Sequence, residues 1–258
     1  MMSWLISVPL SGIGLIVLAL LAVGLESGHL IRLALMRRNP KAARAEGPDQ
    51  LLSAVLGLLA LLLGFTFSLA LGRYEARRDQ VVQESNAIGT TWLRAQLLTE
   101  PNRTAMRDLL RDYVEARLEW SDASAAIPDM ARTAALQAKL WTVIGTAIRT
   151  DPSEQLSRAL MDAMNGSFDM ASARVAARIA HLPDRVLLTL LLFAIISVGL
   201  LGYTMAINGR VHRAATGVLL VLLSLAFVTI LDIDRPRTGA IQVSQQPMLD
   251  LRGSIGAN

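Results

Sequence analysis

Residues 51–98, LLSAVLGLLALLLGFTFSLALGRYEARRDQVVQESNAIGTTWLRAQLL, carry the strongest structural signal in the sequence. The first part of this stretch, Leu51–Gly72, contains no Asp, Glu, Lys, Arg or His, and about 20 mostly apolar residues suffice to cross a bilayer as a helix. The residues that follow, 73–78, are polar and contain neither Gly nor Pro. We therefore expect one continuous helix from Leu51 to about Leu98, roughly 70 Å long at 1.5 Å per residue.

Three other stretches have the same length and the same absence of charge. Of the 258 residues, 53% are apolar and 18% charged, whereas a soluble domain has about 25% charged residues. The first stretch has no positive charge before it and no A-x-A site after it, so we interpret it as a retained helix and not a signal peptide. The sequence predicts four spans: Trp4–Leu25, Leu51–Gly72, Val186–Ile207 and Ala214–Leu231.

A polar insert separates the second span from the third. Its apolar residues recur at helical spacing, as at Met106, Leu110 and Val114, and no run alternates as a strand would. In the tail, residues 241–244 alternate, which predicts a short extended segment before a last helical turn after Pro247. We expect four helices in the insert, at about Arg73–Leu98, Pro101–Trp120, Pro128–Arg149 and Pro152–Ala180.

The predicted fold class is therefore all-α: an integral membrane protein with two transmembrane helical hairpins and a helical-bundle insert between spans two and three. The expected domains are the first hairpin (1–72), the polar insert (73–185), the second hairpin (186–231) and the C-terminal tail (232–258).

Charge counts bear on the orientation of the chain. The insert has 15 basic and 15 acidic residues and the tail has three of each, so the two loops at 26–50 and 208–213 carry the net charge of +4. The positive-inside rule for short loops counts seven Lys/Arg on the loop side against three on the tail side. This favours cytoplasmic loops, with the N-terminus, insert and tail extracytoplasmic. Counting the arginines that flank the insert reverses the tally to nine against seven.

The second and fourth spans end on the same membrane face, which brings two charged segments to one level. One reading is a structural collar of salt bridges at the membrane surface, and the other is a charged vestibule at a pore mouth. The mixed signs leave both open. The residues of this pore-mouth charge cluster are Arg73, Arg77, Arg78, Asp232, Asp234 and Arg235.

Small residues recur every four positions in the second span, at Ala60, Gly64, Ser68 and Gly72. Such a stripe lets another backbone approach closely, either inside one subunit or between subunits.

Overlapping the stripe are four candidate pore-lining residues, Phe65, Thr66, Phe67 and Ser68. The hydroxyls would line a hydrated pore and the rings would form a dewetting gate; in a packed bundle the hydroxyls would instead bond the carbonyl one turn back.

Several function classes lack the residues that they need. The chain has no cysteine, and His29, His181 and His212 lack any ligand spacing. The insert has no G-x-S-x-G, Walker or H-E-x-x-H motif. It is electrically neutral, which argues against nucleic-acid binding, and the spans hold no charge, which argues against a proton-coupled pump. We expect no enzyme, no cofactor, no metal and no nucleic-acid partner.

Two parts of the chain resemble a known family. They are residues 62–90, which include LLGFTFSLA and VVQESNAIGT, and residues 231–250, which begin with LDIDRP. They resemble bacterial four-span membrane proteins with a bestrophin-like domain, a family of unknown function. The resemblance covers nearly the whole chain and implies two helical hairpins around a helical insert, with a relation to pentameric anion channels. Bestrophins place the helical region and tail in the cytoplasm, opposite to the short-loop count here.

The matching stretch contains Glu84 and Asn86, about three turns beyond the second span. These side chains either lie on a helix face that meets solvent or the tail, or contact an ion or ligand in an oligomeric vestibule.

The leading hypothesis from sequence is a homo-oligomeric ion channel of the plasma membrane, the bacterial inner membrane, with the second span lining the pore. Its partners would be the lipid bilayer, further copies of the chain and inorganic ions. The alternative is a non-catalytic sensor or scaffold whose insert binds a ligand or partner protein.

Overall fold

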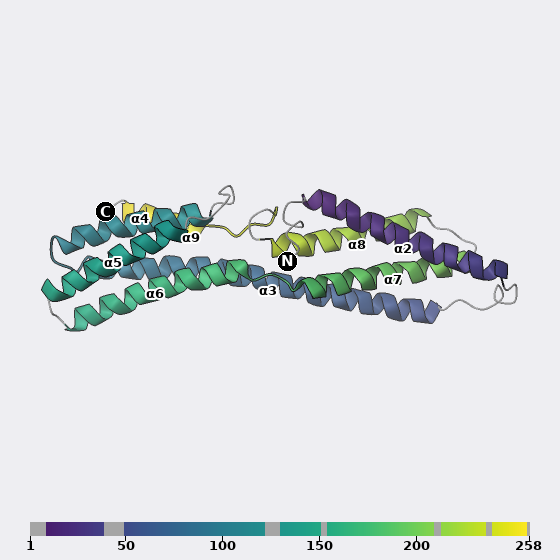
Figure 1. Cartoon of the computed structure of the whole chain (residues 1–258), viewed down its shortest axis with the longest axis horizontal. Coiled ribbons are helices and arrows are strands. Elements are labelled where there is room, and N and C mark those ends of the chain that lie inside the picture. The colour runs from purple at the N-terminus through teal and green to yellow at the C-terminus, as the bar shows by residue number, and fades with distance from the viewer. Residues whose placement is uncertain are drawn as a thin grey trace. The chain divides into compact units, whose positions relative to one another are not determined.

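A computed structural model describes residues 9–38, 49–121, 130–150, 154–208, 213–235 and 239–256. Within these ranges every regular element is a helix, which confirms the all-α prediction (Figure 1). The helices are α2 (Leu10–Arg38), α3 (Asp49–Ala95), α4 (Asn102–Ser121), α5 (Met130–Thr150), α6 (Glu154–Ile179), α7 (Asp184–Asn208), α8 (Arg213–Asp234) and α9 (Gln246–Gly256).

The chain divides into two compact units, each of which has its own packing. The membrane unit consists of residues 1–72 and 181–241, and the polar unit of residues 73–180 and 242–258. The helix α3 has 47 residues and continues through the boundary at Gly72. Its first part therefore belongs to the membrane unit and the rest to the polar unit. The tail is divided as well: residues 232–241 belong to the membrane unit and α9 to the polar unit.

Four helical stretches are long and apolar enough to span a membrane, as the sequence predicts. They lie in α2, α3, α7 and α8, with mean hydropathies of 2.1, 2.4, 2.5 and 2.5. The predicted start of the first span, Trp4, lies outside the described residues.

The helix of the first span is longer than predicted. It continues through Glu26 to Arg38, where the sequence reading places a loop. That reading took the first charge as the end of the helix, but residues 26–38 contain no proline and one glycine, Gly28, so no backbone signal ends the helix there.

Glycines bring α2 and α7 into backbone contact inside the membrane unit. A Cβ atom on Gly28 would lie 1.8 Å from the carbonyl oxygen of Gly199, and one on Gly202 would lie 2.0 Å from that of Leu25. Neither position has room for any side chain. Gly24 is also close, with its Cβ position 2.9 Å from the Ile195 carbonyl oxygen. The two helices therefore pack with their backbones in direct contact.

The polar unit encloses a hydrophobic core built by five helices. Fully buried side chains from α3, α4, α5 and α6 include Ile88, Tyr113, Leu140 and Met164, and α9 adds Met248. The predicted helices are present, with ends shifted by a few residues; the predicted starts Pro128 and Pro152 lie outside the described residues. The last helix has 11 residues, more than the expected single turn, because its apolar side chains pack into this core.

Candidate functional site

The small-residue stripe of α3 faces outward from the chain. Ala60, Gly64, Ser68 and Gly72 are all exposed, and a Cβ atom on Gly64 or Gly72 would have no atom within 4 Å. No packing partner for the stripe therefore lies among the described residues of the chain.

The four candidate pore-lining residues do not share one face. Consecutive helical residues are 100° apart, and Thr66 points inward, 5% exposed, with its hydroxyl donating to the Leu62 carbonyl at 2.8 Å. This is the hydrogen bond expected in a packed bundle. Phe65 and Phe67 are 60% and 40% exposed, and Ser68 is exposed. The outward face of α3 thus carries Phe65 and Ser68 beside the small residues.

An apolar groove of about 420 Å³ runs beside this face. Leu63, Gly64 and Phe67 of α3 form one wall. The other wall is the α8 side, which contributes Leu222, Leu225, Ala226, Thr229 and Ile230.

The two aspartates of the charge cluster hold the backbone of their own unit. Asp232 accepts a hydrogen bond from the Ala240 N–H at 2.7 Å, and Asp234 accepts one from the Leu182 N–H at 2.9 Å. Both carboxylates are buried. Gly239 approaches so closely that a Cβ atom there would lie 2.1 Å from Asp232 Oδ1. The aspartates of residues 231–234 therefore hold in place the backbone at Ala240 and at Leu182.

Arg77 does the same within the polar unit. Its guanidinium donates to the carbonyls of Ala177 at 3.2 Å and Ala180 at 2.6 Å, at the C-terminal end of α6, where carbonyls lack helical partners and a positive charge is favoured. Arg77 is 5% exposed, Arg73 is half-buried and Arg78 is exposed.

Arg235 is buried, and this burial lowers its pKa, although the nearby Asp232 raises it. Neither the salt-bridge collar nor the charged vestibule predicted from sequence includes the hydrogen bonds that Asp232, Asp234 and Arg77 form with backbone groups.

Glu84 lies in the interior of the polar unit. It is 0% exposed and forms ion pairs with Arg117 and with Arg174, the latter at 2.5 Å. Arg174 also donates to the Gln245 side chain at 2.5 Å, which ties the tail to this cluster. Burial lowers the pKa of Arg174, while Glu84 opposes that shift. Asn86, two residues on, is exposed. Of the two vestibule candidates, Glu84 is therefore buried in the polar unit and Asn86 is exposed on its surface.

Trp120 lies close to three arginines, two of which are the partners of Glu84. Arg117, Arg174 and Arg178 lie 4.5, 5.2 and 4.3 Å from the ring centroid, within the range of cation–π attraction. The Glu84 cluster, meaning Glu84, Arg117, Arg174, Arg178 and Trp120, therefore joins α3, α4 and α6. No pattern in the sequence marked Trp120 or the two distant arginines as partners of Glu84.

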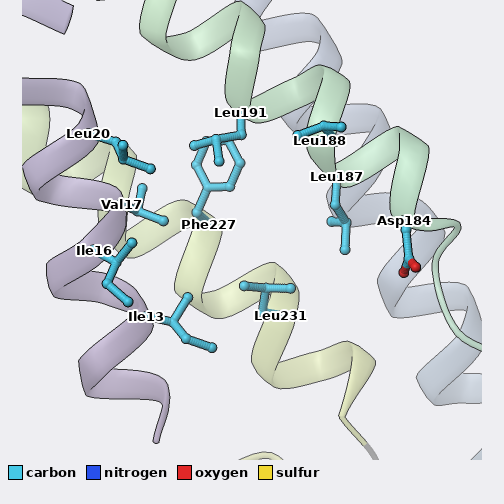
Figure 2. Close-up of a pocket in the computed structure, with 10 residues that line it drawn as sticks. All are labelled: Ile13, Ile16, Val17, Leu20, Asp184, Leu187, Leu188, Leu191, Phe227 and Leu231. Atoms are coloured by element: carbon cyan, nitrogen blue, oxygen red, sulfur yellow. The ribbon is translucent and has the colours of Figure 1, made fainter. Parts of the chain in front are cut away.

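An apolar pocket of about 260 Å³ lies between α2, α7 and α8 near the start of α7 (Figure 2). Ile13 and Val17 of α2 face Leu187 and Leu191 of α7 and Phe227 of α8, as Figure 2 shows. Apart from Asp184, every side chain around it is apolar. A pocket of this composition suits hydrocarbon and lacks the polar groups of an active site.

Metal chemistry has no candidate site in the part of the chain that the structure describes, where no three His, Asp or Glu side chains gather. This architecture is that of a multi-pass, all-helical membrane protein, with four apolar helices whose spans carry many exposed large apolar side chains. The bestrophin-like domain matches residues 15–248, and the chain belongs to the bestrophin-like family.

Solved structures share the fold at low sequence identity. A bacterial bestrophin homologue from Klebsiella pneumoniae is 13% identical over 91% of this chain and 97% of that chain, with a TM-score of 0.64. A single-residue variant of that homologue is 13% identical over 93% and 97%, with a TM-score of 0.68. Another membrane protein structure is 14% identical over 91% and 97%, with a TM-score of 0.66. No curated protein matches the chain.

Proposed function

We propose that the protein is a homo-oligomeric ion channel of the bacterial inner membrane. The observation that carries this proposal is the outward face of α3, where Gly64, Phe65, Ser68 and Gly72 lie exposed in a charge-free span. Small residues allow helices of neighbouring subunits to approach, and a hydroxyl beside an aromatic ring is suited to a hydrated constriction. Membership of the bestrophin-like family supports the proposal, because bestrophins are related to pentameric anion channels.

In this proposal the spans form two hairpins, α2 with α3 and α7 with α8, and the polar unit is their helical insert. The short-loop charge count supports cytoplasmic loops and an extracytoplasmic insert. Arg73 and Arg78, which follow the apolar part of α3, are proposed to line the pore mouth, and Asn86 is proposed to face a vestibule. Asp232 and Asp234 anchor backbone within the membrane unit, and Arg77 anchors backbone within the polar unit.

The test is ion flux through purified protein in liposomes. Phe65→Ala is expected to change the flux severalfold, because Phe65 is exposed on the proposed pore face. The matched control is Thr66→Ala, which alters the next residue along the helix but one that is buried and bonded within its own helix. Equal flux changes in both variants, or no flux under any voltage, pH or calcium concentration, would contradict the proposal.

A non-catalytic scaffold is the second candidate, and exposed apolar residues of the polar unit favour it. Leu93, in the last turn of α3, and Leu97, two residues beyond its end, are each 66% exposed, and Trp141 on α5 is 45% exposed. Large apolar side chains on an otherwise polar surface indicate a contact with another chain. Purification at endogenous expression with a stoichiometric second protein, lost in a Leu93→Ser/Leu97→Ser variant, would favour this candidate over a channel.

A further inference from the structure

A second pocket lies between α2, α7 and α8, at the other end of these helices from the pocket of Figure 2. It encloses about 230 Å³, less than the roughly 300–1,000 Å³ of sites for drug-sized ligands. Glu26 and His29 of α2 line one side, and Arg213 and Thr216 of α8 line the other. A group of the size of a lipid headgroup fits this space better than a larger ligand.

The pocket lies at the boundary of the apolar spans. Glu26 is the first charged residue after the uncharged run of α2, and Arg213 is the last before the uncharged run of α8. Leu25, Met205 and Leu220 form the apolar part of the lining. Charged residues at such positions mark the membrane surface, so this pocket has a charged rim and an apolar floor.

The rim has charges of both signs that are available to a ligand. Within the described ranges, no hydrogen bond or ion pair engages the Glu26 carboxylate, the His29 ring or the Arg213 guanidinium. Glu26 and Arg213 are exposed, and His29 is half-buried. A zwitterionic ligand could therefore place its negative group next to Arg213 and its positive group next to Glu26.

The walls of the pocket are held in place by close contacts. Gly202 lines the pocket and abuts the Leu25 carbonyl oxygen, which locks α7 against α2. Across the other gap the Thr216 hydroxyl donates to Met205 Sδ at 3.5 Å. A pocket whose walls are fixed by such contacts requires little ordering when a ligand binds.

We propose that this pocket binds a phosphoethanolamine group, presented as the headgroup of a zwitterionic phospholipid. Arg213 and His29 donate hydrogen bonds to the phosphate oxygens. Glu26 accepts hydrogen bonds from the primary ammonium, and the apolar floor contacts the first carbons of the lipid tails. A choline headgroup has no N–H to donate to Glu26, and a glycerol headgroup has no positive charge. The proposal does not depend on ion conduction.

The experiment measures lipid binding to the purified, delipidated full chain in detergent by native mass spectrometry. Short-chain phosphatidylethanolamine is expected to bind about tenfold more tightly than phosphatidylcholine or phosphatidylglycerol. Glu26→Gln should reduce this preference to about twofold or less, while Arg213→Gln should weaken the binding of all three lipids. Arg38→Gln, an exposed arginine at the end of α2, is the control and should leave binding unchanged.

A blocking variant tests the position of the site without removing a charge. Gly217 lies between Arg213 and Leu220 on the pocket face of α8, and a Cβ atom there would have no neighbour within 4 Å. Gly217→Leu should therefore fold normally, as checked by its melting temperature, and abolish the phosphatidylethanolamine preference. Gly57→Leu, at an equally open position on α3, should retain it.

Free phosphoethanolamine distinguishes the two sources of the headgroup. Failure of the soluble compound to displace the lipid at equal concentration supports a lipid ligand, and full displacement supports the same headgroup chemistry from a soluble molecule. Equal binding of all three lipids by the wild type, or an unchanged preference in folded Gly217→Leu, would overturn the proposal.

Discussion

In the membrane unit α2 and α7 meet backbone to backbone, whereas in the polar unit the helices meet through large side chains. The first contact depends on Gly28 and Gly202, where a Cβ atom would lie 1.8 and 2.0 Å from a backbone oxygen of the other helix. The second is built from an apolar core and the Glu84 cluster, in which a fully buried carboxylate is paired with two arginines.

The difference follows from the solvent around each unit. Lipid tails are as apolar as leucine, so spans gain little from burying apolar area and associate by close packing instead. Water drives apolar side chains of the polar unit into a core. A buried charge there must be paired, because an unpaired one is costly.

Glycines on α3 show that residue type alone does not decide between these roles. Gly28 touches another helix, while Gly57, Gly64 and Gly72 have open space where a side chain would stand. Four experiments test these contrasts, in order of decreasing expected effect on stability.

Removal of the buried carboxylate should have the largest effect on stability. Glu84→Ala leaves Arg117 and Arg174 without their buried partner, and we expect a loss of about 3–5 kcal/mol in the free energy of unfolding of the polar unit. Chemical denaturation followed by tryptophan fluorescence measures it. The control Glu119→Ala breaks the exposed pair with Arg132 and should cost less than about 1 kcal/mol; similar losses in the two variants would refute the buried pairing.

Alkaline pH should destabilise the polar unit through Tyr113. Burial raises its pKa from 10.0 to about 12, so the folded state keeps the phenolic proton at a pH where the unfolded state has lost it. This contribution to stability is complete below pH 10 and is lost as the pH rises to about 12, by up to about 3 kcal/mol. Denaturation at several pH values should show a smaller loss for Tyr113→Phe; an identical pH profile would exclude this role.

The glycine contact in the membrane unit should tolerate no side chain. Gly28→Ala would place its Cβ against the Gly199 carbonyl and should cost about 1–3 kcal/mol, because the two helices must separate. Thermal unfolding in detergent measures the loss. Gly57→Ala, at an open helical position, should instead stabilise by about 0.5–1 kcal/mol, and the interpretation fails if both changes act in the same direction.

Enlarging the exposed stripe should leave the stability of the chain unchanged and alter its assembly. Gly64→Leu has no neighbour to displace, so the free energy of unfolding should change by less than about 0.5 kcal/mol. Light scattering in detergent should show a smaller oligomer if the stripe lies between subunits. Ala19→Leu, at an exposed position on α2, serves as the control; an oligomer unaffected by Gly64→Leu would remove the stripe from the subunit interface.

Much of the fold follows from local patterns. The four spans and the long α3 depend on runs of residues without helix-breaking signals. Such runs form helices whatever the rest of the chain does, so they can be predicted locally. The predicted end of the first helix at Leu25 is wrong, because α2 continues past the charged Glu26 to Arg38. Gly24 and Gly28 were also missed as a packing pair, although their four-residue spacing was visible in the sequence.

Hydropathy and helical period are properties of neighbouring residues, so the amino-acid sequence alone was enough to predict an all-helical membrane protein with charge-free spans. That Gly28 and not Gly64 packs inside the chain, and that Glu84 pairs with Arg117 and Arg174, is seen only in the folded protein. Asp232 and Asp234 likewise bind backbone groups that no charge count reveals. These outcomes depend on which residues, distant along the chain, come together in space, and identical residue types on two helices carry no information about that choice.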